Sequence, residues 1–481
     1  MKQLLTPLLV LICFSSGAQQ WIDKVYTYDS TLNVTYGTAL NFNNEADTLK
    51  MDIYLPHCDD LLHESKRPLL LWIHGGAFLA GSKEDASITN LCKQFAKRGY
   101  VTAGINYRLG FISDDAAWNC NYPNYSCVFA ADSAEWIRAM YRGIQDGKGA
   151  LRYLINRYDD FRIDTANVFV AGESAGAFIA MGIALLDTAV ERFPQTYQIA
   201  DATLPHPNSY TCTYNTGQTF SGNGIPRPDL GGIEGSIEPT TINYTLKGVG
   251  NMYGAMAADL LKYIPANKPK PAIYSFHQPC DLVVPIDSNR VMAGITWCLT
   301  NGYNCYGITN TPKVYGSRTI SNWNTVNNYG YSIQNEFTNV NFPYNFLFGQ
   351  ASCADQANNP CHAYDSPPLR ENNLASFFAD LITTNPVCEP SLVSSDNSFN
   401  FDEPLISVYP NPATDILKVN TKTNTINYLI IIDCYGKIVF SKKSVNSPYY
   451  NVNIANLPAG LYFWVADTEA GKRFSGRVVK Q

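Results

Sequence analysis

The spacing of apolar residues predicts a series of β-strands in the first 350 residues or so of the chain. Apolar and polar residues alternate at 49–55, which is typical of a half-buried strand, whereas 69–73 is a continuous apolar run typical of a strand covered on both faces. We therefore expect the first strand at a sheet edge and the second at the centre. Further strands are expected at 100–107, 167–171, 245–252, 272–276 and 344–348.

Helical periodicity fills the segments between these strands. Residues 130–158 repeat apolar side chains at helical spacing, and residues 175–186 form an apolar helix. A closing helix is expected at 372–382. Alternating strands and helices predict the α/β class, with a mostly parallel, doubly wound sheet.

The chain is predicted to hold two domains. Its 481 residues exceed one average domain, and the alternating pattern occupies residues 19–388. Two long polar inserts, at about 191–238 and 298–341, interrupt that pattern and are expected to be lids or binding loops. A polar linker follows at 389–404. Residues 405–481 predict a small all-β sandwich, with strands at 406–409, 416–419, 428–432, 438–441, 450–454 and 461–466.

The N-terminus has the pattern of an export signal, which we place at residues 1–18. Lys2 precedes an apolar run at 4–14, and the small residues at 16–18 suit cleavage. The run is too short to span a bilayer, and Ile12 before Cys13 argues against lipid attachment. No later apolar stretch has the length of a membrane span, so we expect an exported protein without a transmembrane segment.

Composition and charge narrow the function further. Hydrophobic residues make up 46% and charged residues 16% of the chain, which indicates a globular protein. The formal net charge of −6 and the absence of a Lys/Arg run argue against nucleic acid as a partner.

Cys13 lies in the expected signal peptide, and the other twelve of the thirteen cysteines are expected to form disulfides after export, because disulfides persist in oxidising compartments. The paired CxxC or HxxxH spacings of zinc sites are absent from the sequence, and we expect neither a metal nor a cofactor. The connectivity stays open, although three close pairs stand out: Cys120 with Cys127, Cys298 with Cys305, and Cys353 with Cys361.

Ser174 lies in a Gly-x-Ser-x-Gly motif, Gly172 to Gly176, and is our candidate nucleophile. The motif alone is modest support, but here it follows a predicted strand and opens a predicted helix. The small flanking residues permit the sharp turn that lifts a serine hydroxyl above a sheet. The helix start also directs its positive dipole end at developing negative charge.

A second motif, His74-Gly75-Gly76-Ala77-Phe78, follows the central strand at 69–73. Its small residues suit bare backbone N–H groups that face a substrate, as an oxyanion hole requires. We assign the amides of Gly76, Ala77 and Ala175 as the expected oxyanion donors.

With these two motifs, the sequence resembles the carboxylesterase branch of the α/β-hydrolase superfamily over about residues 49–382. The resemblance also includes Gly81-Ser82, the run Ile105 to Leu109, and Gln145-Asp146. It implies the α/β-hydrolase fold and a catalytic triad in the chain order Ser, acid, His.

Chain order then selects the other two members of the triad. Among the six histidines, only His362 leaves sufficient chain after Ser174 for a strand that carries the acid. Asp281 follows the strand at 272–276 in a segment that resembles the acid loop of small esterases, and Asp287 is the reserve candidate. Cys280 and Cys361 adjoin Asp281 and His362, so disulfides there would rigidify both loops.

The expected function is ester hydrolysis. His362 would take the proton of Ser174, Ser174 would attack the ester carbonyl, and Asp281 would hold the imidazole. Substrates in view are acyl or feruloyl esters of polysaccharides, polyesters and small esters. The alternatives are a non-catalytic binding or adhesion protein on a hydrolase scaffold and a serine peptidase of the same fold.

The C-terminal sandwich resembles the sorting domain of the type IX secretion system. The matching residues are Tyr409 to Pro412, Gly460 to Tyr462 and the basic end near Lys480. The resemblance implies passage through the periplasm, the secretion machinery as a partner, and a secreted or outer-membrane surface location. A carbohydrate-binding or adhesion module is the alternative.

Overall fold

A computed structural model describes thirteen segments of the chain: 20–57, 66–111, 133–202, 225–263, 269–281, 283–291, 311–337, 361–383, 406–410, 412–421, 425–433, 437–468 and 473–481. The expected signal peptide and the strand expected at 344–348 lie outside these residues, as do five of the six cysteines in the close pairs.

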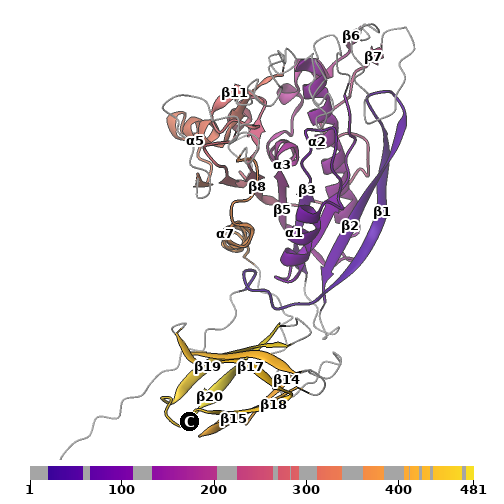
Figure 1. Ribbon diagram of the computed structural model, residues 1–481. Coiled ribbons are helices and arrows are strands. Elements are labelled where there is room, and N and C mark those ends of the chain that lie inside the picture. Colours follow the sequence, from indigo (N-terminus) through magenta and orange to yellow (C-terminus); the bar gives the residue numbers. More distant parts are fainter. Residues whose placement is uncertain are drawn as a thin grey trace, which may run out of the picture. The chain divides into compact units, whose positions relative to one another are not determined.

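A large mixed sheet forms the centre of residues 1–391, the first of two compact units (Figure 1). Its first three strands in space pair antiparallel and the others pair parallel. The predicted α/β-hydrolase fold is confirmed. The spatial order is β1 (Tyr28–Leu40), β2 (Ala46–Pro56), β4 (Val101–Ile105), β3 (Arg67–Ile73), β5 (Ile163–Glu173), β8 (Leu246–Met252), β10 (Ala272–Phe276) and β13 (Ile333–Glu336).

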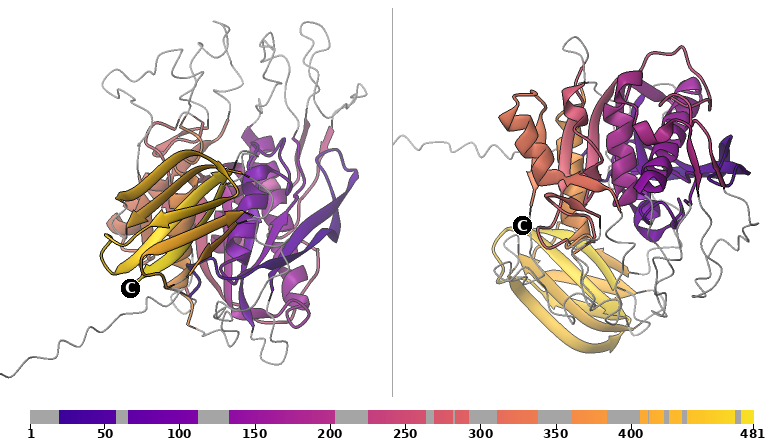
Figure 2. Two further views of the ribbon diagram at one scale, coloured as in Figure 1. Left: turned by 60° about the horizontal axis from the view of Figure 1, so that its bottom comes forward. Right: turned by 90° about the horizontal axis from the view of Figure 1, so that it is seen from above.

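Helices cover both faces of this sheet (Figure 2). On one face, α2 (Ser133–Asn156) and α3 (Ala175–Leu185) share a buried core with alternate side chains of the strands. On the other face, α1 (Ala86–Ala96) and α7 (Pro367–Ala379) pack against the opposite set. The central strand β3 is buried along its whole length, as its continuous apolar run predicts.

Two sequence expectations about this sheet are wrong. The strand at 49–55 is not the edge, because the long antiparallel strand β1 pairs outside it. The insert at 298–341 is not only loop: it includes β12 (Lys313–Gly316), α5 (Ser317–Val326) and the edge strand β13. These elements are short and polar, so they lack the apolar periodicity from which strands and helices are predicted.

Part of the insert at 191–238 packs firmly against α2. The short helix η2 (Ala189–Glu191) leads into the insert, and the short elements within it are η3 (Pro194–Thr196), β6 (Ile199–Ala202) and β7 (Ile225–Arg227). Arg152 of α2 donates hydrogen bonds to the carbonyls of Glu234 and Ile237. Gln145 donates to the carbonyls of Leu230 and Gly232. Residues 230–237 are therefore fixed structure rather than a lid.

Residues 392–481 form the second compact unit, which is all β as predicted. One sheet has the order β14 (Ile406–Tyr409), β15 (Ile416–Thr421) and β18 (Tyr449–Asn453), and the other has the order β17 (Ile438–Ser447), β16 (Ile426–Asp433), β19 (Gly460–Thr468) and β20 (Arg473–Lys480). Side chains from both sheets, such as Leu417 and Trp464, share one core. β20 was not among the strands predicted from the sequence.

Candidate active site

Ser174 lies at a sharp turn between β5 and α3. Its φ of 54° and ψ of −121° are unusual for a residue with a side chain, and its amide donates to the carbonyl of Met252 at 3.0 Å. A Cβ atom on Gly172 would lie 2.2 Å from the carbonyl oxygen of Gly176, and one on Gly176 would lie 2.2 Å from that of Ile73. The two glycines are therefore what allows strand, turn and helix to approach this closely.

The structure brings Ser174, His362 and Asp281 together in one hydrogen-bonded chain. Nε2 of His362 lies 2.7 Å from Oγ of Ser174, and Nδ1 lies 2.8 Å from Oδ2 of Asp281. Asp281 follows β10, at the same edge of the sheet as Ser174 after β5. The reserve candidate Asp287 is exposed and forms an ion pair with Arg318 instead.

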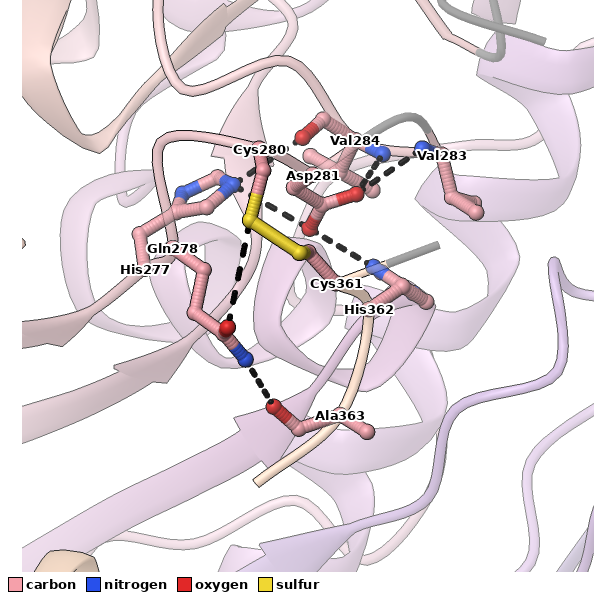
Figure 3. The surroundings of a disulfide bond; sticks show 9 residues. All are labelled: His277, Gln278, Cys280, Asp281, Val283, Val284, Cys361, His362 and Ala363. Carbon is pink, nitrogen blue, oxygen red and sulfur yellow. Dashed lines mark hydrogen bonds and ion pairs between the residues drawn. A yellow bond between two sulfur atoms is a disulfide. The ribbon is translucent and has the colours of Figure 1, made fainter. Parts of the chain in front are cut away.

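The carboxylate of Asp281 is fully buried and surrounded by donors (Figure 3). Its Oδ1 accepts from the amides of Val283 at 2.8 Å and Val284 at 2.9 Å, and its Oδ2 faces both His362 and His277. Burial raises the pKa of Asp281, but the charge interaction with His362 and the hydrogen bonds from both histidines outweigh burial and hold the pKa below its ordinary value. Asp281 is therefore the ionised partner of His362.

A disulfide between Cys280 and Cys361 joins the loops that carry Asp281 and His362 (Figure 3). This bond contradicts the close pair of Cys361 with Cys353, because a cysteine forms only one such bond. Cys280 and Cys361 are 81 residues apart in the sequence, so proximity along the chain was a poor guide to pairing in space. Within the described residues Cys92, in α1, is a buried free thiol.

The loop after β3 passes directly beside Ser174. A Cβ atom on Gly75 would lie 3.1 Å from Cβ of Ser174. Gly76, Ala77 and Phe78 follow with φ values of 100°, 54° and 63°. Among the described residues, no acceptor receives the amide N–H of Gly76, Ala77 or Ala175. These are the three amides that the sequence nominates as oxyanion donors.

His74 and Tyr107 stabilise this loop through hydrogen bonds and ring stacking. The hydroxyl of Tyr107 donates to the carbonyls of His74 and Gly75, each at 3.2 Å, and the two rings stack with centroids 4.4 Å apart. Nδ1 of His74 lies 2.7 Å from the carbonyl oxygen of Gly75. Burial lowers the pKa of His74 to about 4, so the ring is neutral at physiological pH.

Three buried residues beside the triad were not predicted as site residues from the sequence. Glu173 accepts hydrogen bonds from Ser87 at 2.6 Å and Tyr253 at 3.2 Å, and burial raises its pKa. The ring of Tyr253 meets that of His362 edge to face, with centroids 4.8 Å apart. His277 contacts Asp281 and is four residues before it, a spacing that could have drawn attention to it.

Neither a clustered metal site nor a membrane-spanning helix occurs in the described segments. In these segments, no three His, Cys, Asp or Glu side chains are grouped so that they could hold a metal ion. The same segments contain no helix with the length and apolar character that a bilayer crossing requires.

Two family models match parts of this chain. Residues 407–481 match the secretion system C-terminal sorting domain, and residues 51–121 match the family described as BD-FAE. The predicted resemblance to a type IX sorting domain is confirmed, and such a tail indicates export to the cell surface or the medium.

Curated relatives, several of them named as esterases, align with about a third of the chain. Gut esterase 1 of Caenorhabditis elegans is 28% identical over 32% of this chain and 23% of its own length. Probable N-octanoylanthranilate hydrolase AqdA2 of Rhodococcus erythropolis is 28% identical over 34% of this chain and 32% of its own length. Human carboxylesterase 5A is 30% identical over 30% of this chain and 21% of its own length. The chain thus spans a third or less of these relatives, and the predicted resemblance to carboxylesterases is confirmed.

Solved structures of esterases also resemble the chain, at low similarity. A truncated carbohydrate esterase from gut microbiota aligns with 75% of this chain and 98% of its own, at 14% identity and a TM-score of 0.36. Esterase 2 of Thermogutta terrifontis aligns with 73% of this chain and 97% of its own, at 13% identity and a TM-score of 0.34.

Proposed function

We propose that this protein is an exported serine hydrolase that cleaves carboxylic esters, with Ser174, His362 and Asp281 as its catalytic triad. The observation that carries the proposal is the hydrogen-bonded chain from Oγ of Ser174 through His362 to Asp281, with contacts of 2.7 and 2.8 Å. Nucleophile, base and orienting acid at these distances are what acyl transfer requires. The esterase relatives support the same class.

The reaction follows from the positions of these groups. Nε2 of His362 accepts the hydroxyl proton of Ser174 as Oγ attacks the ester carbonyl carbon, and Asp281 stabilises the imidazolium. The amides of Gly76, Ala77 and Ala175 donate to the carbonyl oxygen as it becomes negative, and one such donor is worth on the order of 10² to 10³ in turnover. The alcohol leaves with the proton from His362. Water, deprotonated by His362, then releases the acid from Ser174.

The proposed substrate class is the carboxylic ester, including acyl or feruloyl esters of polysaccharides and small esters. The two alternatives make different predictions. A binding or adhesion protein needs no ionised acid and no serine–histidine contact, and it would show no turnover. A serine peptidase would cleave amide substrates that the esterase leaves intact.

The test is a panel of p-nitrophenyl esters, methyl ferulate, acetylated xylan and p-nitroanilide amides. We expect turnover of at least one ester, and Ser174→Ala should lower kcat by at least about 10⁴-fold. Ser30→Ala, which changes an exposed serine on β1, is the matched control and should retain full activity. A fluorophosphonate should label wild type once and Ser174→Ala not at all. Ester turnover that survives Ser174→Ala would overturn the mechanism.

A further inference from the structure

A buried polar network adjoins Asp281, and the mechanism above does not use it. Its central member is His277, which directly follows β10 and has no exposed surface. Nε2 of His277 lies 3.0 Å from the carbonyl oxygen of Val284 and 3.3 Å from Oδ2 of Asp281 (Figure 3). Nδ1 lies 2.9 Å from Oγ of Ser317, the first residue of α5.

The partners of this network determine which nitrogen of His277 carries the proton. The amide N–H of Gly254 donates to Oδ1 of Asn251 at 3.1 Å, so Nδ2 of Asn251 points the other way. That nitrogen donates to Oγ of Ser317 at 3.1 Å and faces Oγ of Ser275 at 3.3 Å. Ser317 thus has its own O–H proton available for Nδ1 of His277.

The same reasoning fixes the other side of the ring. Nε2 of His277 faces two acceptors, a carbonyl and a carboxylate, and must carry a proton to satisfy either. Nε2 of His277 therefore carries a proton and donates toward Val284 and Asp281, while Nδ1 faces the hydroxyl of Ser317.

Building on the proposed function, we propose that His277 is a positioning residue for catalysis: held by Ser317 and Asn251, it directs Nε2–H at the carboxylate of Asp281 and so fixes the oxygen that receives Nδ1–H of His362. Three donors other than His362 then surround Asp281, namely the amides of Val283 and Val284 and Nε2–H of His277. A carboxylate held this way cannot rotate its Oδ2 away from His362.

A purely structural role for His277 would have a different signature. A buried histidine that only fills the core would alter the stability of the fold, with kcat changing only as far as the folded fraction changes. A positioning residue alters the contact between Asp281 and His362 in molecules that remain folded. Substitutions that keep or remove the Nε2–H donor separate these two roles.

The decisive pair of variants is His277→Gln and His277→Leu. The amide nitrogen of glutamine reaches about where Nε2 lies, so His277→Gln keeps the donor, whereas His277→Leu removes it. We expect His277→Leu to lower kcat on the best ester about tenfold to a hundredfold, as losing an outer-shell partner commonly does, with KM within about twofold. His277→Gln should recover kcat to within about threefold of wild type. His57→Gln, at an exposed histidine on the surface, is the control and should leave kcat unchanged.

A spectroscopic readout makes the test independent of turnover. The Nδ1–H proton of His362 should give a resolved downfield ¹H NMR signal that His362→Ala removes. We expect the signal to shift or broaden in His277→Leu and to persist in His277→Gln. Should His277→Leu fail to fold, Ser317→Ala removes only the hydroxyl that orients His277, and it should lower kcat several-fold and shift the same signal.

The possible failures are distinguishable. If wild type cleaves no ester and takes no fluorophosphonate, the proposed function fails, whatever the NMR signal does. If wild type is active and a folded His277→Leu protein keeps both its kcat and its NMR signal, the positioning role is overturned. Where His277→Leu does not fold, the same result in Ser317→Ala overturns that role. It is equally overturned if His277→Gln loses as much activity as His277→Leu.

Discussion

The Cys280–Cys361 disulfide should contribute to both the stability and the activity of the catalytic unit. The bond closes a loop of 81 residues. Asp281 directly follows Cys280 in the chain, and His362 directly follows Cys361. We consider the double variant Cys280→Ala/Cys361→Ala, because a single substitution would leave a reactive thiol beside the triad. Chemical reduction is less specific, since it would open any other disulfide as well.

The size of the effect follows from the loop length. Cross-linking restricts the unfolded chain, and a closed loop of 81 residues corresponds to about 4.5 kcal/mol at 25 °C in the chain-entropy treatment. At about 2.1 cal/mol/K of unfolding entropy per residue, that free energy lowers Tm by about 6 °C for a unit the size of residues 19–391. We also expect kcat to fall more than KM rises, since substrate contacts are untouched while the acid and base lose their covalent link.

The assay compares thermal unfolding and ester kinetics of the double variant with those of Cys92→Ala. Cys92 is also buried but forms no cross-link in the structure, so that control measures the cost of losing a buried sulfur alone. If the double variant matches Cys92→Ala in both Tm and kcat, the disulfide has neither the stabilising nor the positioning effect argued here.

Three further predictions concern the loop, the turn and the tail. His74 has a pKa of about 4 in the folded protein against 6.5 in the unfolded chain, so its contribution to stability is complete above pH 6.5 and is lost as the pH falls to 4, by about 3 kcal/mol. In urea unfolding experiments across that pH range, the midpoint concentration should therefore fall less steeply with falling pH in His74→Gln than in wild type. Gly176→Ala would place a Cβ atom 2.2 Å from the carbonyl oxygen of Ile73, so we expect it to abolish ester turnover or folding. The same change at Gly232, where no atom lies within 4 Å of the added Cβ, should be tolerated. An active, stable Gly176→Ala protein would contradict the argument that the backbone approaches Gly176 too closely for a side chain. A chain ending at residue 391 should keep its ester kinetics, measured on purified protein, but fail to reach the cell surface or medium, and normal export of this truncation would rule out a sorting role for the tail.

The sequence was most informative where chemistry imposes a local pattern. The turn at Ser174 needs small residues on both sides, and the order of motifs along the chain singles out His362, so both could be nominated without coordinates. The central strands were predictable for the same reason, since burial on both faces demands an uninterrupted apolar run such as that of β3.

What escaped prediction depends on strand pairing and contacts in space, some of them between distant segments. β1 is largely exposed and β13 is short and polar, so neither shows the pattern of a sheet strand, and only their neighbours in space reveal them. The partner of Cys361 is likewise decided by where the loop after β10 lies, not by which cysteine is nearest along the chain. His277 is four residues before Asp281 in the sequence, but only the fold shows that Ser317 and Asp281 lie at its two nitrogens.

The disulfide beside the triad also ties the timing of activity to location. Thiols stay reduced in the cytoplasm, so Cys280 and Cys361 can join only after the chain has entered an oxidising compartment. The sorting tail indicates that the chain makes this journey. Newly made chains would therefore hold Asp281 and His362 less firmly than exported ones, so ester hydrolysis by the proposed triad would reach its full rate only after export.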